Sequence, residues 1–239
     1  SVCVIGGQQS EDGVVMLGAP ALAANAAMRT GCGNAILAMP QSVLQSGLQL
    51  APSSTGIALP IDEVGRVMPS PSMELLDAHA SGCSCFALGT GFGCGWSQQQ
   101  LVSTLLSREE KPIVLDADGL NALAQLEGGQ LDIHAPVIMT PHIVEYQRLA
   151  QRQGIEVEAS QVEDAAIALA QAYGCVVVLK SHITVITNGV TTEVETTGQV
   201  VLATGGSGDV LTGIISGLLA QYRAGGCKAG LLEAAVLGV

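Results

Sequence analysis

Short runs of apolar residues alternate along the chain with longer segments in which apolar residues recur three and four positions apart. The first pattern is typical of a strand buried on both faces, and the second of an amphipathic helix. The predicted strands are Val2–Ile5, Ala35–Ala38, Cys85–Leu88, Ile113–Leu115, Val137–Met139, Val176–Leu179 and Thr184–Thr187. The predicted helices are Ala19–Arg29, Ser97–Leu106, Leu120–Leu126, Val144–Gln151, Ser160–Ala172 and Val210–Tyr222. The alternation predicts an α/β fold: a three-layer sandwich with a mostly parallel central sheet and helices on both faces.

Local signals add detail to this prediction. Gly31 and Gly174 stand where two helices should end. The segments Thr191–Glu195 and Val200–Leu202 are expected to form a short antiparallel hairpin ahead of the last helix. The segment Gln41–Ser72, with its scattered Pro, Ser and Gly, allows no assignment. The apolar start of the chain has no basic segment or cleavage pattern, so it indicates a buried first strand and not a signal peptide.

Composition and charge exclude several classes of function. The 239 residues contain no stretch that resembles a linker, so we expect one domain over residues 1–239. The net charge is −12 with only nine Lys and Arg, which argues against nucleic acid or an anionic membrane as a partner. The mean hydropathy is +0.44, but the longest apolar stretches, such as residues 210–222, are shorter than a membrane span.

The cysteines point to a reducing compartment. There are seven, an odd number, and no two are spaced as Cys-x-x-Cys, which predicts reduced thiols and a cytoplasmic location. Cys83 and Cys85 could form half a metal site, but no histidine or second cysteine pair follows at ligand spacing.

A glycine-rich turn followed by one carboxylate is the most informative motif. It runs Thr204-Gly205-Gly206-Ser207-Gly208-Asp209 and opens the last predicted helix. Glycines let the backbone approach an anion closely, and the first N–H groups of a helix have no intrahelical acceptor, so a phosphate fits there. A carboxylate beside a bound anion is repelled unless a cation or a proton transfer accounts for it, which makes Asp209 a candidate base. The alternative is an ordinary turn with a helix cap.

Other chemical groups follow the predicted strands. They are the loop Gly89–Gly93, the aspartates Asp116 and Asp118, His142, and Lys180. The carboxyl ends of parallel strands share one edge of a sheet, so these residues predict a ligand cleft there. Individually they have simpler interpretations: either aspartate can cap a turn or helix, His142 can fill a first-turn position, and Lys180 can be a solvated side chain. Glu145 is expected to favour the start of its own helix.

Taken in order, these motifs resemble a known family. They are Gly18-Ala19-Pro20, Gly89–Gly93, Asp116-Ala117-Asp118-Gly119-Leu120-Asn121, Thr140-Pro141-His142 with Glu145, Leu179-Lys180, and Ala203–Leu211. The chain looks like the ADP-dependent NAD(P)H-hydrate dehydratases of the ribokinase-like superfamily. That family restores NADH and NADPH from forms in which water has added to the nicotinamide ring. The resemblance implies a lyase of metabolite repair with a ribokinase-like sandwich fold.

The resemblance also implies roles for individual residues. Substrate-binding residues would be Ala19, Gly91, His142 and Asp209; nucleotide-binding residues would be Lys180, Ser181, His182, Ile183, Thr184, Gly205, Gly206 and Gly208. The chain departs from the family at Ser181, where glycine is usual, and at Thr90, where proline is usual. Serine fits at position 181 only with a negative φ. The chain also ends within an expected helix, which predicts a domain truncated at its C-terminal helix.

The implied chemistry is phosphorylation of the ring hydroxyl followed by elimination of phosphate. Asp209 would be the catalytic base, and the Gly205–Gly208 amides would hold the transferring phosphoryl group. ADP is the expected donor, because Thr184 stands where ATP-using relatives usually have an acidic residue, and Mg²⁺ is expected to bridge the phosphates. The metal ligands stay unassigned. The resemblance further implies a homo-oligomer, a tetramer, and an NAD(P)H-hydrate epimerase as a partner or fused domain.

Two other functions stay open on the sequence. An ATP-dependent small-molecule kinase of the same superfamily would use the same glycine turn, although the segments Asp116–Asn121 and Thr140–His142 favour the dehydratase. A catalytically silent nucleotide-binding subunit would keep the cleft, but a pure binder gains nothing from Asp209 beside phosphate.

Overall fold

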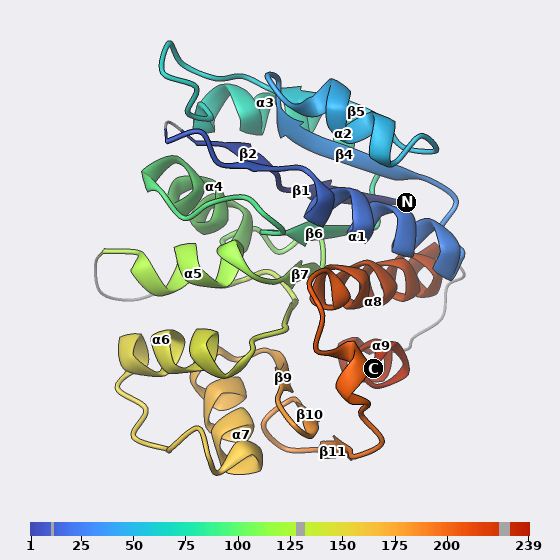
Figure 1. The fold of residues 1–239 in the computed structure, drawn as a ribbon. Coiled ribbons are helices and arrows are strands. Elements are labelled where there is room, and N and C mark those ends of the chain that lie inside the picture. The colour runs from blue at the N-terminus through green and yellow to red at the C-terminus, as the bar shows by residue number, and fades with distance from the viewer. Residues whose placement is uncertain (11, 128–131, 225–229) are drawn as a thin grey trace.

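The computed structural model describes residues 1–10, 12–127, 132–224 and 230–239, and its centre is a nine-stranded sheet. The strand order is β11-β10-β9-β8-β7-β6-β1-β4-β5 (Figure 1). The strands from β9 to β5 run parallel, while β10 is antiparallel to both β9 and β11. The predicted fold class, a mostly parallel sheet inside three layers, is therefore confirmed.

The central strands consist of consecutive apolar residues because both of their faces are covered. The strands of the sheet are β1 (Val2–Ile5), β4 (Ala35–Pro40), β5 (Thr55–Leu59), β6 (Cys85–Leu88), β7 (Ile113–Leu115), β8 (Val137–Met139), β9 (Val176–Lys180), β10 (Thr184–Thr187) and β11 (Thr192–Glu195). Every residue of β1, β6, β7 and β8 is buried. A separate two-stranded hairpin, β2 (Gln8–Gln9) with β3 (Val15–Met16), follows β1.

Helices cover both faces of the sheet (Figure 1). One face packs against α3 (Pro69–Ala80), α4 (Trp96–Leu106), α5 (Asp118–Gln125), α6 (Ile143–Gln153) and α7 (Val162–Tyr173). The other packs against α1 (Gly18–Thr30), α2 (Leu44–Leu50), α8 (Ser207–Ala224) and α9 (Leu231–Gly238). Among the described residues, no helix is long and apolar enough to cross a membrane.

The predicted elements agree with the structure in most places, and one of them is wrong. All seven predicted strands are present, and Gly31 and Gly174 end their helices in the left-handed conformation, with φ of 110° and 63°. The predicted hairpin of Thr191–Glu195 with Val200–Leu202 is wrong. Residues Thr192–Glu195 pair with the edge of β10 that β9 leaves open. Val200–Leu202 form a 3₁₀ turn, η1, and not a partner strand. The unassigned segment Gln41–Ser72 holds α2, β5 and the start of α3.

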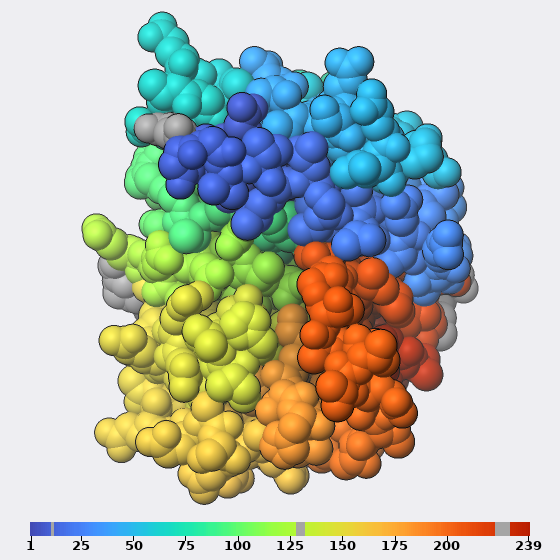
Figure 2. Space-filling view, viewed as in Figure 1, coloured from blue at the N-terminus to red at the C-terminus, as the bar shows by residue number. Residues whose placement is uncertain are grey.

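The pair α1 and α8 brings the glycine turn to the edge of the sheet. Both helices lie side by side on one face, and glycines of α8 allow this close approach. The space for a side chain at Gly213 is filled by the Ala23 carbonyl, and a Cβ on Gly217 would lie 2.9 Å from the Ala27 carbonyl. In the space-filling view, the orange segment that leads into α8 lies against the blue surface of α1 (Figure 2).

Candidate active site

A buried ion pair joins two of the predicted strand-end residues. Lys180 ends β9 and Asp116 follows β7, and the Lys180 Nζ lies 3.0 Å from Asp116 Oδ1. Asp116 is almost fully buried, and its second oxygen accepts a hydrogen bond of 2.8 Å from the Thr212 hydroxyl. Thr212 stands on α8, one turn after Asp209. The Asp116 carboxylate therefore contacts both the Lys180 ammonium and the first turns of α8.

The glycine turn lies directly against this ion pair. A Cβ built on Gly208 would lie 3.4 Å from Lys180 Nζ and 3.8 Å from Asp116 Oδ2. Gly206 has a φ of +95°, which favours glycine, and its missing side chain leaves room for Leu22 of α1. The start of α8 thus lies beside the lysine ammonium, and a helix N-terminus next to a cation suits a phosphate.

Asp209 lies in the first turn of α8, among like charges. Its burial, together with the carboxylates of Asp116 and Asp118, raises its pKa to about 6, against the opposing effect of Lys180. A base with a pKa near 6 is ionised at neutral pH and still accepts a proton effectively.

A strained residue separates the two aspartates. Ala117 has a φ of 49° and is the only described residue other than glycine with a positive φ. This conformation sends Asp116 toward Lys180, while Asp118 Oδ2 accepts a hydrogen bond of 2.8 Å from the Gly93 amide. Asp118 therefore anchors the loop Gly89–Gly93. Neither aspartate side chain caps α5, whose N-cap is Ala117, so the interpretation of these aspartates as helix caps is not what the structure shows.

His142 and Glu145 form a reciprocal cap on α6. The His142 Nδ1 accepts from the Val144 and Glu145 amides, and Glu145 Oε2 accepts from the His142 amide at 2.8 Å. The expectation that Glu145 favours its own helix start is therefore confirmed. Its burial raises its pKa to about 7, and burial also lowers the pKa of His142. Because Nδ1 is an acceptor, Nε2 is the remaining ring nitrogen of His142, and it lies 3.4 Å from Glu145 Oε1.

Ala19 and Gly91 are neighbours at the start of α1. A Cβ on Gly91 would lie 3.4 Å from the Ala19 Cβ and 3.0 Å from that of Met16. Gly91 has a φ of +61°, so the loop requires glycine here. The structure thus brings these two predicted substrate residues together, beside the β2–β3 hairpin.

The predicted nucleotide residues after Lys180 form the tight connection between β9 and β10. The Ser181 amide donates to the Ile183 carbonyl at 3.0 Å, and the Ser181 hydroxyl lies 3.2 Å from His182 Nδ1. Ser181 and His182 are exposed, whereas Ile183 and Thr184 are half-buried. Ser181 has a negative φ, so serine replaces glycine there without strain.

Sequence reasoning missed Thr212. It is fully buried on α8 and completes the hydrogen bonds of Asp116. A signal existed in the spacing, because Thr212 stands three residues after Asp209 and therefore on the same side of the helix.

Comparisons with known proteins agree with this geometry. The family model described as NAD(P)H-hydrate dehydratase matches residues 2–238. The chain is 34% identical over 228 residues to the ADP-dependent (S)-NAD(P)H-hydrate dehydratase of Neisseria meningitidis, covering 92% of this chain and 69% of that protein. The chain belongs to the NAD(P)H-hydrate dehydratase family.

Other members of the NAD(P)H-hydrate dehydratase family are longer. The bifunctional NAD(P)H-hydrate repair enzyme of Moorella thermoacetica is 36% identical over 221 residues, which are 90% of this chain but 41% of that protein. Among solved structures, the ADP/ATP-dependent NAD(P)H-hydrate dehydratase of Bacillus subtilis, co-crystallized with ATP/Mg²⁺, is 27% identical. It matches with a TM-score of 0.71 over 99% of this chain and 76% of its own. The ribokinase of Thermotoga maritima, at 15% identity and a TM-score of 0.59 over 99% of this chain and 89% of its own, shares the fold.

Proposed function

We propose that this chain carries out the ADP-dependent dehydration of NAD(P)H-hydrate to NAD(P)H. The observation that carries the proposal is the position of Asp209, beside a glycine turn that lies against the Lys180 ammonium. The turn suits a transferring phosphoryl group, and a carboxylate in that place suits a base.

The proposed reaction has two steps. Asp209 takes the proton of the ring hydroxyl as its oxygen attacks the terminal phosphorus of ADP; an O–P bond forms, the phosphoanhydride bond breaks, and AMP leaves. The lone pair of the ring nitrogen then expels phosphate with the C–O electron pair, and loss of a proton from the neighbouring carbon restores the double bond. In this scheme Lys180 and the amides of Gly205, Gly206 and Gly208 stabilise the charge on the phosphoryl oxygens.

The two substrates occupy different parts of the cleft in this proposal. The dinucleotide contacts Ala19, Gly91, His142 and Asp209. The adenine nucleotide lies against Lys180, the connection from Ser181 to Thr184, and the glycine turn. The support is the adjacency of Ala19 to Gly91 on one side and of Lys180 to Gly208 on the other.

The residues present are compatible with Mg²⁺. The described part of the chain holds no group of three or more His, Cys, Asp or Glu that could bind a metal alone. Mg²⁺ commonly arrives on nucleotide phosphates and uses one or two carboxylates. The pKa of Asp209 is raised by Asp116 and Asp118, and a cation near these carboxylates would offset their mutual repulsion. Asp209 is the candidate to face it, because Asp116 is engaged by Lys180 and Thr212 and Asp118 accepts hydrogen bonds from Gly93 and Asn121. When bound, the metal would neutralise phosphate charge.

We also propose ADP as the preferred donor. ATP brings an additional phosphate, yet the sequence has no Lys or Arg from Ser181 to Tyr222 to neutralise it. An unpaired charge in a partly desolvated cleft is costly. The Bacillus subtilis relative is named for both nucleotides, so the preference has to be measured.

Assembly and location are part of the same proposal. We expect a cytoplasmic homo-oligomer, a tetramer, that works with an NAD(P)H-hydrate epimerase. The support for an epimerase is that relatives such as the Moorella thermoacetica protein are bifunctional and longer than this chain.

The direct test incubates the purified protein with hydrated NADH and ADP and follows the near-ultraviolet absorbance of the reduced nicotinamide ring. Recovery of this absorbance, with one AMP and one phosphate formed per NADH, is the expected result. A stable phosphorylated product without recovery would support a kinase instead. Nucleotide binding without any turnover would support a silent subunit.

A further inference from the structure

A cavity of about 790 Å³ lies away from the glycine turn. It is formed by segments that follow four neighbouring strands: Gln8–Ser10 after β1, Pro40 at the end of β4, the loop that begins at Asp62 after β5, and Gly95–Gln98 after β6. Its volume is typical of a small-molecule site, and it lies at the sheet edge where parallel folds bind ligands.

A continuous path of contacts joins this pocket to the candidate active site. Leu22 of α1 touches the glycine turn at Gly206, and Ala19 stands one helical turn earlier on the same side of α1. Ala19 lies beside Gly91, which contacts Met16 of the β2–β3 hairpin.

The hairpin then leads into the pocket. Gln8 pairs with Met16 across the hairpin, and the side chain of Gln8 fills the space beside Gly93 while lining the pocket. The candidate active site and the pocket are therefore joined by packed residues and lie along the same edge of the sheet.

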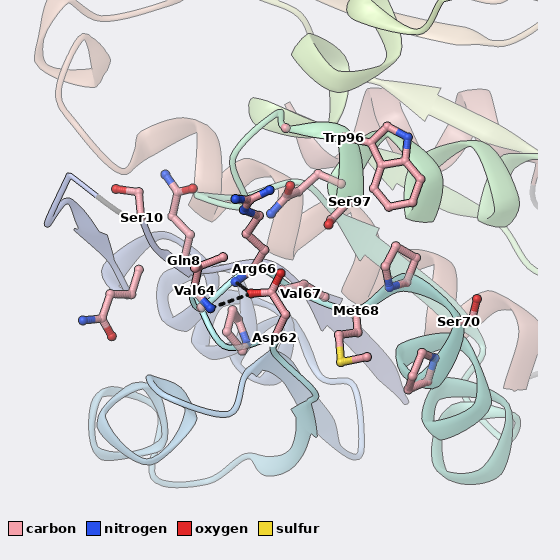
Figure 3. Close-up of a pocket in the computed structure, with 17 residues that line it drawn as sticks. Gln8, Ser10, Asp62, Val64, Arg66, Val67, Met68, Ser70, Trp96 and Ser97 are labelled. Atoms are coloured by element: carbon pink, nitrogen blue, oxygen red, sulfur yellow. Dashed lines mark hydrogen bonds between the residues drawn. The ribbon is translucent and has the colours of Figure 1, made fainter.

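The lining of the pocket combines an indole with a guanidinium. Trp96 is the only tryptophan of the chain, and it is 68% exposed at the start of α4. In Figure 3 the Arg66 guanidinium lies between the side chains of Gln8 and Ser97, and the Trp96 indole lies beyond Ser97. The nearby Asp62 carboxylate is engaged by the Val64 and Arg66 amides.

We propose that this pocket binds the adenylate half of the dinucleotide substrate. The proposal rests on the proposed function. In that reaction the nicotinamide half of the substrate lies at Asp209, so the adenylate half needs a second binding region. The indole offers a stacking surface for adenine, and the guanidinium offers charge to a phosphate in a chain with few cations. The polar side chains of Gln8 and Ser97 supply hydrogen bonds to the ribose and base edges.

The single tryptophan makes the pocket directly observable. Trp96 fluorescence should be quenched saturably by AMP and by NAD⁺, and not by ribose 5-phosphate or nicotinamide mononucleotide. Arg66→Gln should raise the dissociation constant of AMP about tenfold. Arg29→Gln, which removes the same charge from an exposed position outside the pocket, should leave it unchanged.

Turnover separates this site from the rest of the cleft. Trp96→Ala should raise the KM for hydrated NADH about tenfold. It should leave unchanged the KM for ADP and kcat/KM for hydrated nicotinamide mononucleotide, which lacks the adenylate. Equal losses with both hydrated substrates would overturn the assignment.

The outcomes also distinguish this proposal from the proposed function. Turnover of hydrated NADH with no quenching by AMP and no effect of Trp96→Ala would reject the pocket alone. Saturable, Arg66-dependent quenching without any turnover would keep the adenylate site and reject the dehydratase. A fluorescence change that depends on protein concentration without ligand, and is matched by self-association in sedimentation, would assign the pocket to a second copy of the chain and overturn the proposal.

Discussion

At the scale of single residues, Asp116 organises the candidate active site. One of its oxygens holds the Lys180 ammonium and the other holds Thr212, so the buried charge is both paired and hydrogen-bonded. The strained Ala117 and the hydrogen bond from Gly93 to Asp118 keep the neighbouring loop in place. In the proposed reaction Asp116 and Thr212 would be positioning residues, since they would act through Lys180 and α8.

Thr212→Val should weaken nucleotide binding without removing the lysine. Asp116 would lose one hydrogen bond and Lys180 would lose its fixed position, so the KM for ADP should rise about 5- to 10-fold. Thr212→Ser, which keeps the hydroxyl, should restore the KM to near the wild-type value. Steady-state kinetics at fixed hydrated NADH measure both, and a Thr212→Ser variant as weak as Thr212→Val would show that Thr212 acts through packing.

The raised pKa of Asp209 predicts the pH dependence of the reaction. The base works only when ionised, so kcat/KM should increase about tenfold per pH unit up to a pH of about 6 and level off above it. Glu145, with a pKa of about 7, is another group whose ionisation could produce such a pH dependence. The variant Glu145→Gln should therefore keep the same rise of kcat/KM with pH. If the rise of kcat/KM with pH disappears in Glu145→Gln, or if it levels off near the ordinary pKa of an aspartate, the assignment of Asp209 as the base is contradicted.

At the scale of elements, the packing of α1 against α8 sets the position of the glycine turn. The helices approach closely because Gly213 and Gly217 carry no side chain where α1 carbonyls lie. The same contact places Ala19 and Leu22 of α1 beside the Gly91 loop and Gly206. The two proposed substrate regions are therefore held by one pair of helices.

Gly213→Ala should destabilise the fold, because its Cβ would meet the Ala23 carbonyl, a backbone group that cannot rotate away. The free energy of unfolding should fall by about 1–3 kcal/mol. Gly33→Ala is the matched control, since nothing lies within 4 Å of its Cβ and its φ is not positive. Urea denaturation of both variants tests the prediction, and equal stabilities would count against close packing at Gly213.

The buried strands were predictable because two covered faces require uninterrupted apolar residues. The edge strand β5 alternates exposed and buried positions over only five residues, and α3 begins with Pro69 and Pro71, so both resembled a loop. The run Val200–Leu202 looked like a strand, but its side chains are 60–92% exposed in a 3₁₀ turn. Apolar composition alone does not predict whether a segment pairs with an edge strand of the sheet.

The residues of the candidate site were predictable from the sequence, but the hydrogen bonds and ion pairs between them were not. Parallel strands place Lys180, His142 and Asp116 at one edge, which the strand assignment implies. Which partner each side chain takes depends on side-chain packing between α8, α1 and the loops. The bond from Thr212 to Asp116 joins residues 96 positions apart, and no local pattern predicts it.

At the scale of the whole molecule, the protein is strongly acidic, although the proposed reaction uses anionic substrates. The net charge is −12 with nine Lys and Arg, while both substrates in the proposed reaction are anions. Long-range repulsion should therefore slow their encounter, whereas the buried Lys180 pair is little affected by solvent ions.

The rate of substrate capture should therefore rise with salt. Between about 0.01 and 0.15 M ionic strength the screening length falls from roughly 30 to 8 Å, so kcat/KM for hydrated NADPH should increase about two- to fivefold. Hydrated nicotinamide mononucleotide, which carries less charge, should respond less. A steady fall of kcat/KM with salt for both substrates would show that local attraction dominates their capture.

The role of Asp209 is the central claim, and one comparison tests it most directly: turnover of hydrated NADH with ADP by the wild-type protein and by Asp209→Asn. The amide keeps the shape of the side chain and removes the base, so kcat should fall by about 10²- to 10⁴-fold. The dissociation constant of ADP should stay within about threefold, and Asp164→Asn, an exposed aspartate in the first turn of α7, should be fully active. An Asp209→Asn variant with kcat within about threefold of wild type would contradict the account.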